Sequence, residues 1–321
     1  MKKTLLAIIA SIITLAAPLA QGEGPIDETR FTLREELVRL INRDRKQFGL
    51  APVQLDPFAS AVADNYCKQQ IRDRSAGHFG LDGLSPYMRY SFAGGNDGVS
   101  ENAAAWSASY SFSARALYEM MHRSEEEMMA EVPPHDGHRR AILDPFATHV
   151  GIGLAWEHGE FRIAEEFVRR YVTWTKAVPR TATVDEKLLC SARPLPGYSV
   201  DAVTVHYEPL PEPISLTLAN KIESYSLPEK RSEYLPRLRQ PYRRAVATGM
   251  EEVVPQYNDG RRGDFAIADD GSFAFHVPFT EGAGVYTIVV WVQKHGEAEA
   301  IPATNVSVRV HDVAQVSYSS Q

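Results

Sequence analysis

The sequence has little of several features that usually reveal a protein's class. It contains only two cysteines, Cys67 and Cys190, in 321 residues, which excludes a small fold held together by several disulfides. Its 34 Lys and Arg residues are outnumbered by 41 Asp and Glu residues, so it lacks the basic surplus that binds nucleic acid. Beyond the N-terminal segment no run approaches about 18 apolar residues, and we therefore expect no membrane span.

Signatures of an organised nucleophile are also missing. The chain has no Gly-x-Ser-x-Gly, no His-Glu-x-x-His, and no cysteine close to a histidine predicted to lie in a site. A binding protein is therefore favoured over an enzyme, although the residues leave the question of catalysis open.

Residues 1–22 predict a cleaved signal peptide. Lys2 and Lys3 precede an apolar run from Leu5 to Leu15, as in exported proteins. The stretch Ala20-Gln21-Gly22 has the small-residue spacing of a cleavage site, and cuts after either small residue fit equally well. Losing the two lysines and no acid changes the formal charge from -7 to -9. We therefore expect a secreted or periplasmic protein.

The two cysteines leave two alternatives open. In an exported chain Cys67 and Cys190 could form one disulfide, which would tie the region around residue 190 to the first domain. The alternative is a pair of buried free thiols, and the spacing does not decide between them.

The first domain is predicted to span residues 30–175 and to mix helices with strands. Thr32 and Glu35 form a capping box that opens a helix, and Asp56 before Pro57 opens a second. Alternating strands with a turn between them predict an antiparallel hairpin. The expected elements are helices over 32–48, 57–71 and 113–129 and strands over 149–156 and 160–172.

The remainder is predicted to be a linker, residues 176–197, followed by an all-β sandwich of immunoglobulin type over residues 198–313. Short alternating segments separated by turn residues suggest this architecture. The charged, proline-bearing stretch 229–244 is expected to be a long exposed loop. The expected strands are 199–207, 214–218, 242–248, 264–268, 272–277, 285–292 and 305–310.

Three segments of the first domain carry polar residues beside turn-forming or apolar anchors. His138 lies just before the apolar turn Ala141-Ile142-Leu143, His78 lies in Gly77-His78-Phe79, and Glu101 lies in Ser100-Glu101-Asn102. Polar side chains at the edge of a core tend to meet one another, so we expect a single polar pocket assembled from the three segments.

These segments and their order resemble the CAP superfamily, which includes cysteine-rich secretory proteins, antigen 5 and plant pathogenesis-related proteins. The resemblance covers residues 33–172 and is of the bacterial type, without the extra disulfides of vertebrate and plant members. Ser100 departs from the family's Gly-Glu-Asn motif. The matching stretches are Leu40 to Arg45, Phe48 to Asp56, Gly77-His78-Phe79, Ser100-Glu101-Asn102, Gly137 to Pro145 and Val150 to Gly153.

The resemblance implies a three-layer α-β-α sandwich with a cleft that holds two histidines and two acids and often a divalent metal. His78, Glu101 and His138 match three of these positions. The second acid follows a tryptophan by three residues in the family, so aligning Met128 with that tryptophan selects Glu131. Other acids of the same predicted helix remain alternatives. They are Glu119, Glu125, Glu126 and Glu127.

Imidazoles and carboxylates suit a zinc-type divalent ion, so His78, Glu101, Glu131 and His138 form the predicted metal and ligand site. One acid can instead lie behind a histidine and leave a position for water. A purely structural cluster of charge-assisted hydrogen bonds is the alternative. His135 and His149 are interpreted as polar residues on a wet surface.

Three functions compete. The leading hypothesis is a secreted CAP-domain protein whose cleft binds a divalent metal and an extracellular ligand, with the β-sandwich as a presentation module. The second is a metal-assisted hydrolase of cell-wall or peptide substrates. The third, a lipid- or sterol-binding carrier, rests on the resemblance alone. The ligand, whether cell wall, peptide or lipid, is not identified by the residues.

Overall fold

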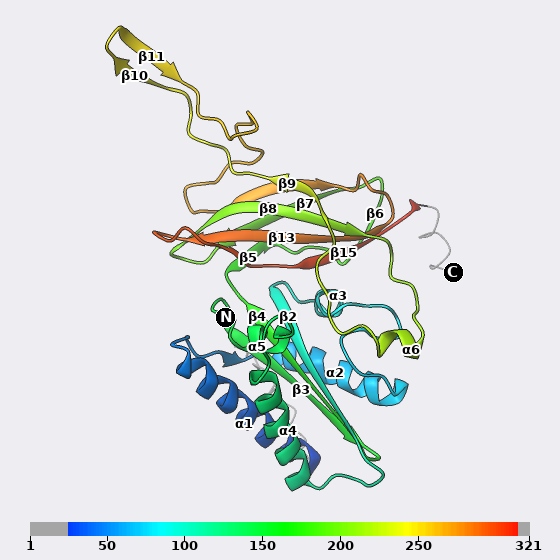
Figure 1. The fold of residues 1–321 in the computed structure, drawn as a ribbon. Helices are drawn as coiled ribbons and strands as arrows, with labels where there is room; N and C mark the ends of the chain where they lie inside the picture. The colour runs from blue at the N-terminus through cyan, green and yellow to red at the C-terminus, as the bar shows by residue number, and fades with distance from the viewer. Residues whose placement is uncertain (1–24, 314–321) are drawn as a thin grey trace, which may run out of the picture.

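The computed structural model describes residues 25–313, which form a mixed α/β region followed by a region dominated by strands (Figure 1). The predicted signal peptide, residues 1–22, lies outside the described residues. Within residues 25–313 no helix combines the length and the apolar character needed to cross a membrane.

The α/β region consists of helices on both faces of one sheet. Its strands follow the order β1-β3-β4-β2, in which only the short β1 is parallel to its neighbour, so β2 is an edge strand. Its elements are α1 (Pro25–Gln47), β1 (Gln54–Leu55), α2 (Pro57–Asp73), α3 (Pro86–Phe92), β2 (Gly98–Ser107), α4 (Ala114–Met129), α5 (Gly137–Ile142), β3 (His149–Glu157) and β4 (Glu160–Arg169).

The two faces of this sheet are covered differently. Helices α1 and α4 pack on one face over a large apolar core that includes Leu37, Met121 and Phe161. Helix α2 lies directly on the other face, because a Cβ atom at Gly151 or Gly153 would overlap the helix backbone at its closest points. These two glycines therefore set how close α2 lies to β3.

Local signals explain where two of the helices begin. The Asp56 side chain accepts a hydrogen bond from the backbone of Ala59 (2.7 Å) at the start of α2, and Ser113 caps α4 in the same way. The helices expected at 57 and 113 and the hairpin of β3 and β4 are confirmed. Helix α1 begins at Pro25, earlier than the capping box at Thr32 predicts.

From β5 onward the chain forms two sheets with a shared apolar core. Strands β12, β7 and β5 make a three-stranded sheet, and β6, β15, β13, β8 and β9 make a larger one to which β14 is added at β13. The strands are β5 (Val172–Lys176), β6 (Thr181–Thr183), β7 (Lys187–Pro194), β8 (Tyr198–Glu208), β9 (Lys230–Tyr234), β10 (Tyr242–Val246), β11 (Gly249–Val253), β12 (Phe273–Pro278), β13 (Gly284–Lys294), β14 (Ala300–Pro302) and β15 (Val306–His311).

Two predictions for this region are wrong. Residues 176–197 are not a linker, because they contain β6 and β7, and β5 pairs with β7. Residues 214–218 are not a strand but lead into the short helix α6 (Leu216–Ala219), whose first turn is capped by the Ser215 side chain. The linker error arises because β6 is short and β7 ends at a proline, and the strand error arises because the Ser215 cap of a four-residue helix outweighs the alternation of apolar residues.

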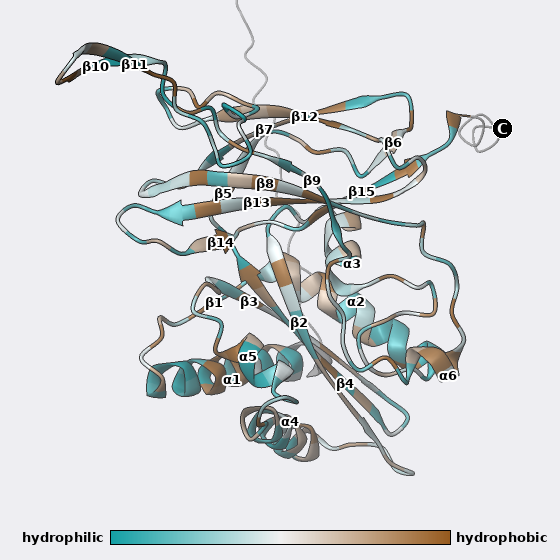
Figure 2. Cartoon of the chain, turned by 45° about the horizontal axis from the view of Figure 1, so that its top comes forward, coloured by the Kyte–Doolittle hydropathy of each residue, from teal (hydrophilic) through white to brown (hydrophobic). Residues whose placement is uncertain are grey.

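The segment between β9 and β12 projects from the larger sheet as an arm that ends in the hairpin of β10 and β11 (Figures 1 and 2). Every residue of β10 is exposed, and Figure 2 shows hydrophilic and hydrophobic residues mixed along the hairpin. The predicted exposed stretch 229–244 therefore includes two strands in addition to loop.

Cys67 and Cys190 are free thiols buried in separate cores. Cys67 lies on the buried face of α2, and Cys190 lies on β7 in the core of the C-terminal sheets. Burial raises the pKa of the Cys190 thiol to about 12. The disulfide alternative is therefore excluded in favour of the buried thiols.

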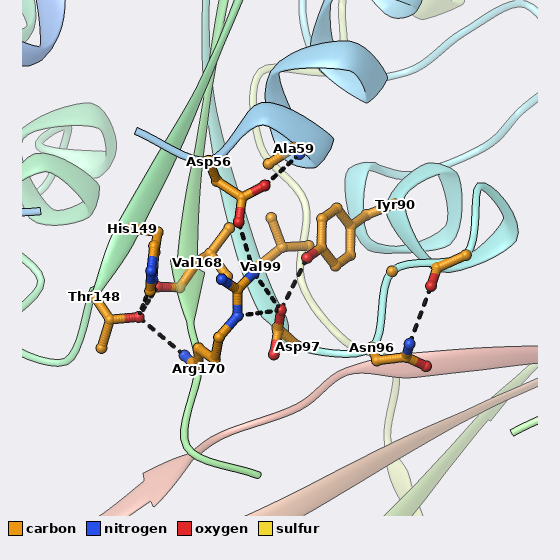
Figure 3. Close-up of polar contacts among 12 residues, drawn as sticks. Asp56, Ala59, Tyr90, Asn96, Asp97, Val99, Thr148, His149, Val168 and Arg170 are labelled. Atoms are coloured by element: carbon orange, nitrogen blue, oxygen red, sulfur yellow. Dashed lines mark hydrogen bonds and ion pairs between the residues drawn. The ribbon is translucent and has the colours of Figure 1, made fainter. Parts of the chain in front are cut away.

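The two regions are joined by polar contacts around the start of β2. The Arg170 guanidinium binds the carboxylates of Asp56 (2.6 Å) and Asp97 (2.9 Å), which brings the cap of α2 and the loop before β2 together (Figure 3). The Trp174 indole donates to the backbone carbonyl of Asn96 (2.9 Å), and Arg180 donates to the Asn96 side chain (2.6 Å). The second region therefore holds the β2 end of the first.

Candidate functional site

A cleft of about 1240 Å³ opens beside β2 and α5, and all four predicted site residues line it. They come from the loop after α2, from β2, from the loop after α4 and from α5. The structure therefore brings together segments that are far apart in the chain. The four residues are His78, Glu101, Glu131 and His138.

His78 is held by the loop that follows α2. Gly77 adopts a positive φ of 88°, a conformation that side chains rarely take. The Gly77 carbonyl accepts hydrogen bonds from the Tyr66 hydroxyl and the Gln70 amide, both at 2.8 Å and both from α2. The position of the His78 imidazole is consequently fixed by the helix.

Glu101 connects His78 to a buried arginine. One Glu101 carboxylate oxygen lies 2.9 Å from His78 Nδ1, and the other accepts a hydrogen bond from Arg89 at 2.6 Å. Arg89 also donates to the His78 carbonyl (2.7 Å), and its guanidinium lies 3.4 Å from the centre of the Tyr66 ring. Burial favours the neutral acid, but Arg89 and His78 outweigh it and lower the pKa of Glu101.

Glu166 lies opposite Glu101 in the β2–β4 register and is fully buried. Neither of its carboxyl oxygens has a hydrogen-bond partner among the described residues. Burial, and next the charge of Glu101, raises the pKa of Glu166 well above its usual range. We therefore assign an ionised Glu101 beside a neutral Glu166.

Glu131 holds the second histidine. Its carboxylate lies 2.5 Å from His138 Nδ1 and also accepts a hydrogen bond from the His138 backbone (3.0 Å) at the start of α5. The Asn102 amide donates to the His138 carbonyl (3.1 Å) from β2. The structure thus places Glu131, the acid selected by aligning Met128, next to His138.

The other acids of α4 lie elsewhere. Glu119 and Glu127 form surface ion pairs with arginines four residues away, and Glu126 is exposed. Glu125 is buried beneath the sheet face next to Glu165. None of these four lines the main cleft.

The two histidines face each other, with ring centroids 6.2 Å apart. Each ring uses Nδ1 for a carboxylate, so no hydrogen bond from the described residues reaches either Nε2. The described residues contain no group of three or more His, Cys, Asp or Glu side chains arranged to hold a metal ion. The available donors are therefore two imidazole nitrogens, with the acids behind them.

Comparison with known proteins identifies the α/β region. The sequence profile of the family described as "CAP: Cysteine-rich secretory protein family" matches residues 38–160. These residues form a CAP domain. No curated protein matches the chain closely enough to count as a relative.

Two solved structures are similar to parts of the chain. The first is an extracellular protein containing a SCP domain from Bacillus anthracis str. Ames, with 16% identity, a TM-score of 0.35 and coverage of 48% of this chain and 45% of that one. The second is an outer surface protein from Borrelia burgdorferi, with 17% identity, a TM-score of 0.36 and coverage of 43% and 93%. The chain thus spans less than half the length of the first.

The CAP domain does not build its cleft alone. Tyr225, from the connection between β8 and β9, also lines it. The Tyr225 hydroxyl accepts a hydrogen bond from the backbone N–H of Glu101 (2.5 Å), and its ring meets the His78 ring edge to face with centroids 4.9 Å apart. Sequence reasoning missed Tyr225, because it lies in a segment without periodicity far from the CAP motifs.

Two further histidines lie near the site. His135 lines the cleft of the CAP domain, but it is exposed and lies on the loop before α5. His149 lies outside the cleft lining, on β3, where its Nδ1 is 2.9 Å from the Thr148 hydroxyl. Burial, followed by the charge of Arg170, lowers the pKa of His149.

Proposed function

We propose that this chain is an exported CAP-domain protein whose cleft binds one divalent cation at His78 and His138 together with an extracellular ligand. The observation that carries the proposal is the pairing of each imidazole Nδ1 with a carboxylate, which leaves both Nε2 atoms available on facing rings. The N-terminal sequence pattern supports export.

The residues present fit such an ion. Histidines that bind metals usually donate their second ring nitrogen to a carboxylate, which fixes the tautomer and strengthens the ligand. Glu101 and Glu131 hold this position for His78 and His138, so they would orient the rings instead of completing a four-residue ligand set. A zinc-type ion bound there would supply a Lewis acid in a wide cleft.

Two further features support a role in binding. The cleft of about 1240 Å³ leaves room for a ligand beside the two imidazoles. The C-terminal region, which we propose to be an immunoglobulin-like sandwich, holds the cleft wall through Tyr225. In this arrangement the C-terminal region presents the CAP cleft and also forms part of it.

Zinc titration of the metal-free protein by calorimetry tests the proposal. We expect about one ion per chain, no measurable binding by the double variant His78→Ala with His138→Ala, and a roughly 10- to 100-fold weaker affinity for Glu131→Gln. His135→Ala is the matched control, because His135 lines the same cleft but pairs with no carboxylate of residues 25–313, and this variant should bind zinc as the wild type does.

Unchanged binding by the double variant would overturn the proposal, as would a protein that takes up no divalent ion. Circular dichroism of each variant separates a lost site from a lost fold.

A further inference from the structure

Strand β2 is the edge of the CAP sheet that faces the cleft. Its one strand neighbour among the described residues is β4, so the opposite side of its backbone is not paired with a strand there. An edge strand presents a row of N–H and C=O groups that can template another extended chain.

The direction of each backbone group on β2 follows from the ladder. Residues of an antiparallel pair alternate between bonding to the partner and pointing away from it. Ala108, just past the strand, bonds to Gly159 on the β4 side, whereas the N–H of Glu101 bonds to Tyr225 on the other side. The outward groups therefore belong to the odd-numbered residues of β2.

The first two outward positions are already filled by the C-terminal region. The Asn305 side chain both accepts from the Val99 N–H (3.1 Å) and donates to the Val99 carbonyl (2.8 Å). This carboxamide makes the same two bonds that the backbone of a paired strand would make. At the next position the Tyr225 hydroxyl takes the N–H of Glu101.

The next two outward positions are open. No described residue hydrogen-bonds to the outward backbone groups of Ala103 and Ala105. These residues carry only methyl groups, and they line a groove of about 470 Å³ between β2 and α4. Glu131 and His138 line both this groove and the main cleft, so the two spaces adjoin at these residues.

We infer that this groove binds an extended segment of polypeptide, which adds to β2 through main-chain hydrogen bonds at Ala103 and Ala105 and leads into the cleft between His138 and His78. The unpaired backbone groups select a peptide over a sugar or a lipid, because only an extended chain repeats donors and acceptors at the spacing of a strand. Tyr225 and Asn305 already occupy the outward backbone groups of Glu101 and Val99, so strand addition is confined to the later positions of β2.

The side chains that line the groove are suited to contact a bound peptide. Trp106 is held by a hydrogen bond from its indole to Ser124 of α4 (2.9 Å), and Arg123 lies 5.0 Å from the centre of the Trp106 ring. Arg123 and Glu127 offer charges of both signs along the groove. Strand addition thus supplies the affinity, and these side chains supply the preference for particular peptides.

The inference rests on the proposed function in one respect, since it names the ligand class of the same cleft. The test uses a random octapeptide library displayed on phage, selected on the full chain without metal, with the enriched peptides then synthesised. We expect Ala103→Pro and Ala105→Pro to weaken their binding at least tenfold, because proline removes the outward N–H. Proline is tolerated at such edge positions, so the fold should survive.

Ser107→Pro is the matched control, since it removes an outward N–H of β2 beyond the groove lining and should leave peptide affinity unchanged. If a proline variant fails to fold, enriched peptides with N-methylated backbones replace it as the probe on the wild type. Bound peptide should also slow hydrogen exchange at the Ala103 and Ala105 amides.

A library without enriched peptides, or peptides that bind the proline variants and the wild type equally, would overturn the inference. Zinc titration of the same preparations separates the two proposals. A wild type that binds the enriched peptides but takes up no zinc would contradict the metal proposal alone, and one that binds zinc but enriches no peptide would contradict the peptide inference alone.

Discussion

The two histidines of the cleft are built alike but supported differently. His78 and its partner Glu101 have side chains that are 8% and 0% exposed, and Arg89 lies behind them. His138 and Glu131 are 32% and 24% exposed, and they lie on the short helix α5 and on the loop after α4, respectively. The first pair is fixed by the core of the CAP domain, whereas the second can adjust to a ligand.

This difference shows how one site can combine rigidity with access. A carboxylate that is buried must have its charge matched within the protein, and Arg89 does this for Glu101. A carboxylate in contact with water has no such need, and Glu131 has none of the described cations in an ion pair other than His138.

The largest effect is expected from a change at the buried pair, His78 and Glu101. Arg89→Met leaves the buried, ionised Glu101 without its arginine partner, and we expect the free energy of unfolding to fall by about 3–5 kcal/mol. Urea denaturation measures the loss. The control is Arg139→Met at the other histidine, where a loss under about 1 kcal/mol is expected. Equal losses of unfolding free energy for the two variants would contradict the difference between the two histidine–carboxylate pairs.

A second prediction concerns Glu125 and Glu165, two buried acids that lie next to each other. Burial raises the pKa of Glu165 to about 7, and burial with the charge of Glu165 raises that of Glu125 to about 10. The folded state then holds protons that the unfolded chain releases above about pH 4.5, so stability should fall as the pH rises from about 5 toward 10.

Glu125→Gln removes most of this dependence, because both Glu125 oxygens lack partners among the described residues and an amide cannot ionise. We expect the variant to be more stable than the wild type by on the order of a few kcal/mol at pH 9 and similar to it at pH 5. Denaturation midpoints across this range measure the difference. A wild type whose stability rises through the same window would contradict the assignment.

The smallest effect is expected from a change at the more exposed pair, His138 and Glu131. Glu131→Gln should change the free energy of unfolding by less than about 1 kcal/mol, because exposed ion pairs contribute little. Glu101→Gln is the same change at the buried pair. It should lower the free energy of unfolding several-fold more, because the buried Arg89 then lacks the Glu101 carboxylate that balances its charge. Thermal unfolding of both variants provides the test, and a larger loss for Glu131→Gln would reverse the assignment of the rigid half.

The sequence predicts the residues that line the cleft better than the buried residues that hold them in place. His78, Glu101 and His138 stand beside turn-forming or apolar residues, and such local anchors can be identified from one sequence. Arg89 cannot be found this way, since arginine is usually exposed and its burial depends on Glu101 of another element. Glu166 carries only a weak signal, an acid within a strand buried on both faces.

The C-terminal region is harder to predict for a related reason. Its alternating strands are visible in the sequence, but β6 and β7 resemble a linker because they are short or close to prolines. Tyr225 reaches Glu101 across 124 positions of sequence, and no periodic pattern marks the segment that carries it. Contacts of this kind depend on how two folded regions meet.

The absence of side chains at Gly151 and Gly153 has a consequence for the width of the cleft. The loop that carries His78 follows α2, and the height of α2 above the sheet is limited by these two glycines of β3. The backbone of His138 is anchored from β2 by the Asn102 amide. The two missing methyl groups therefore let α2 approach β3, and Gly153→Ala would push α2, and with it the start of the loop that carries His78, away from the sheet without altering any residue that lines the cleft.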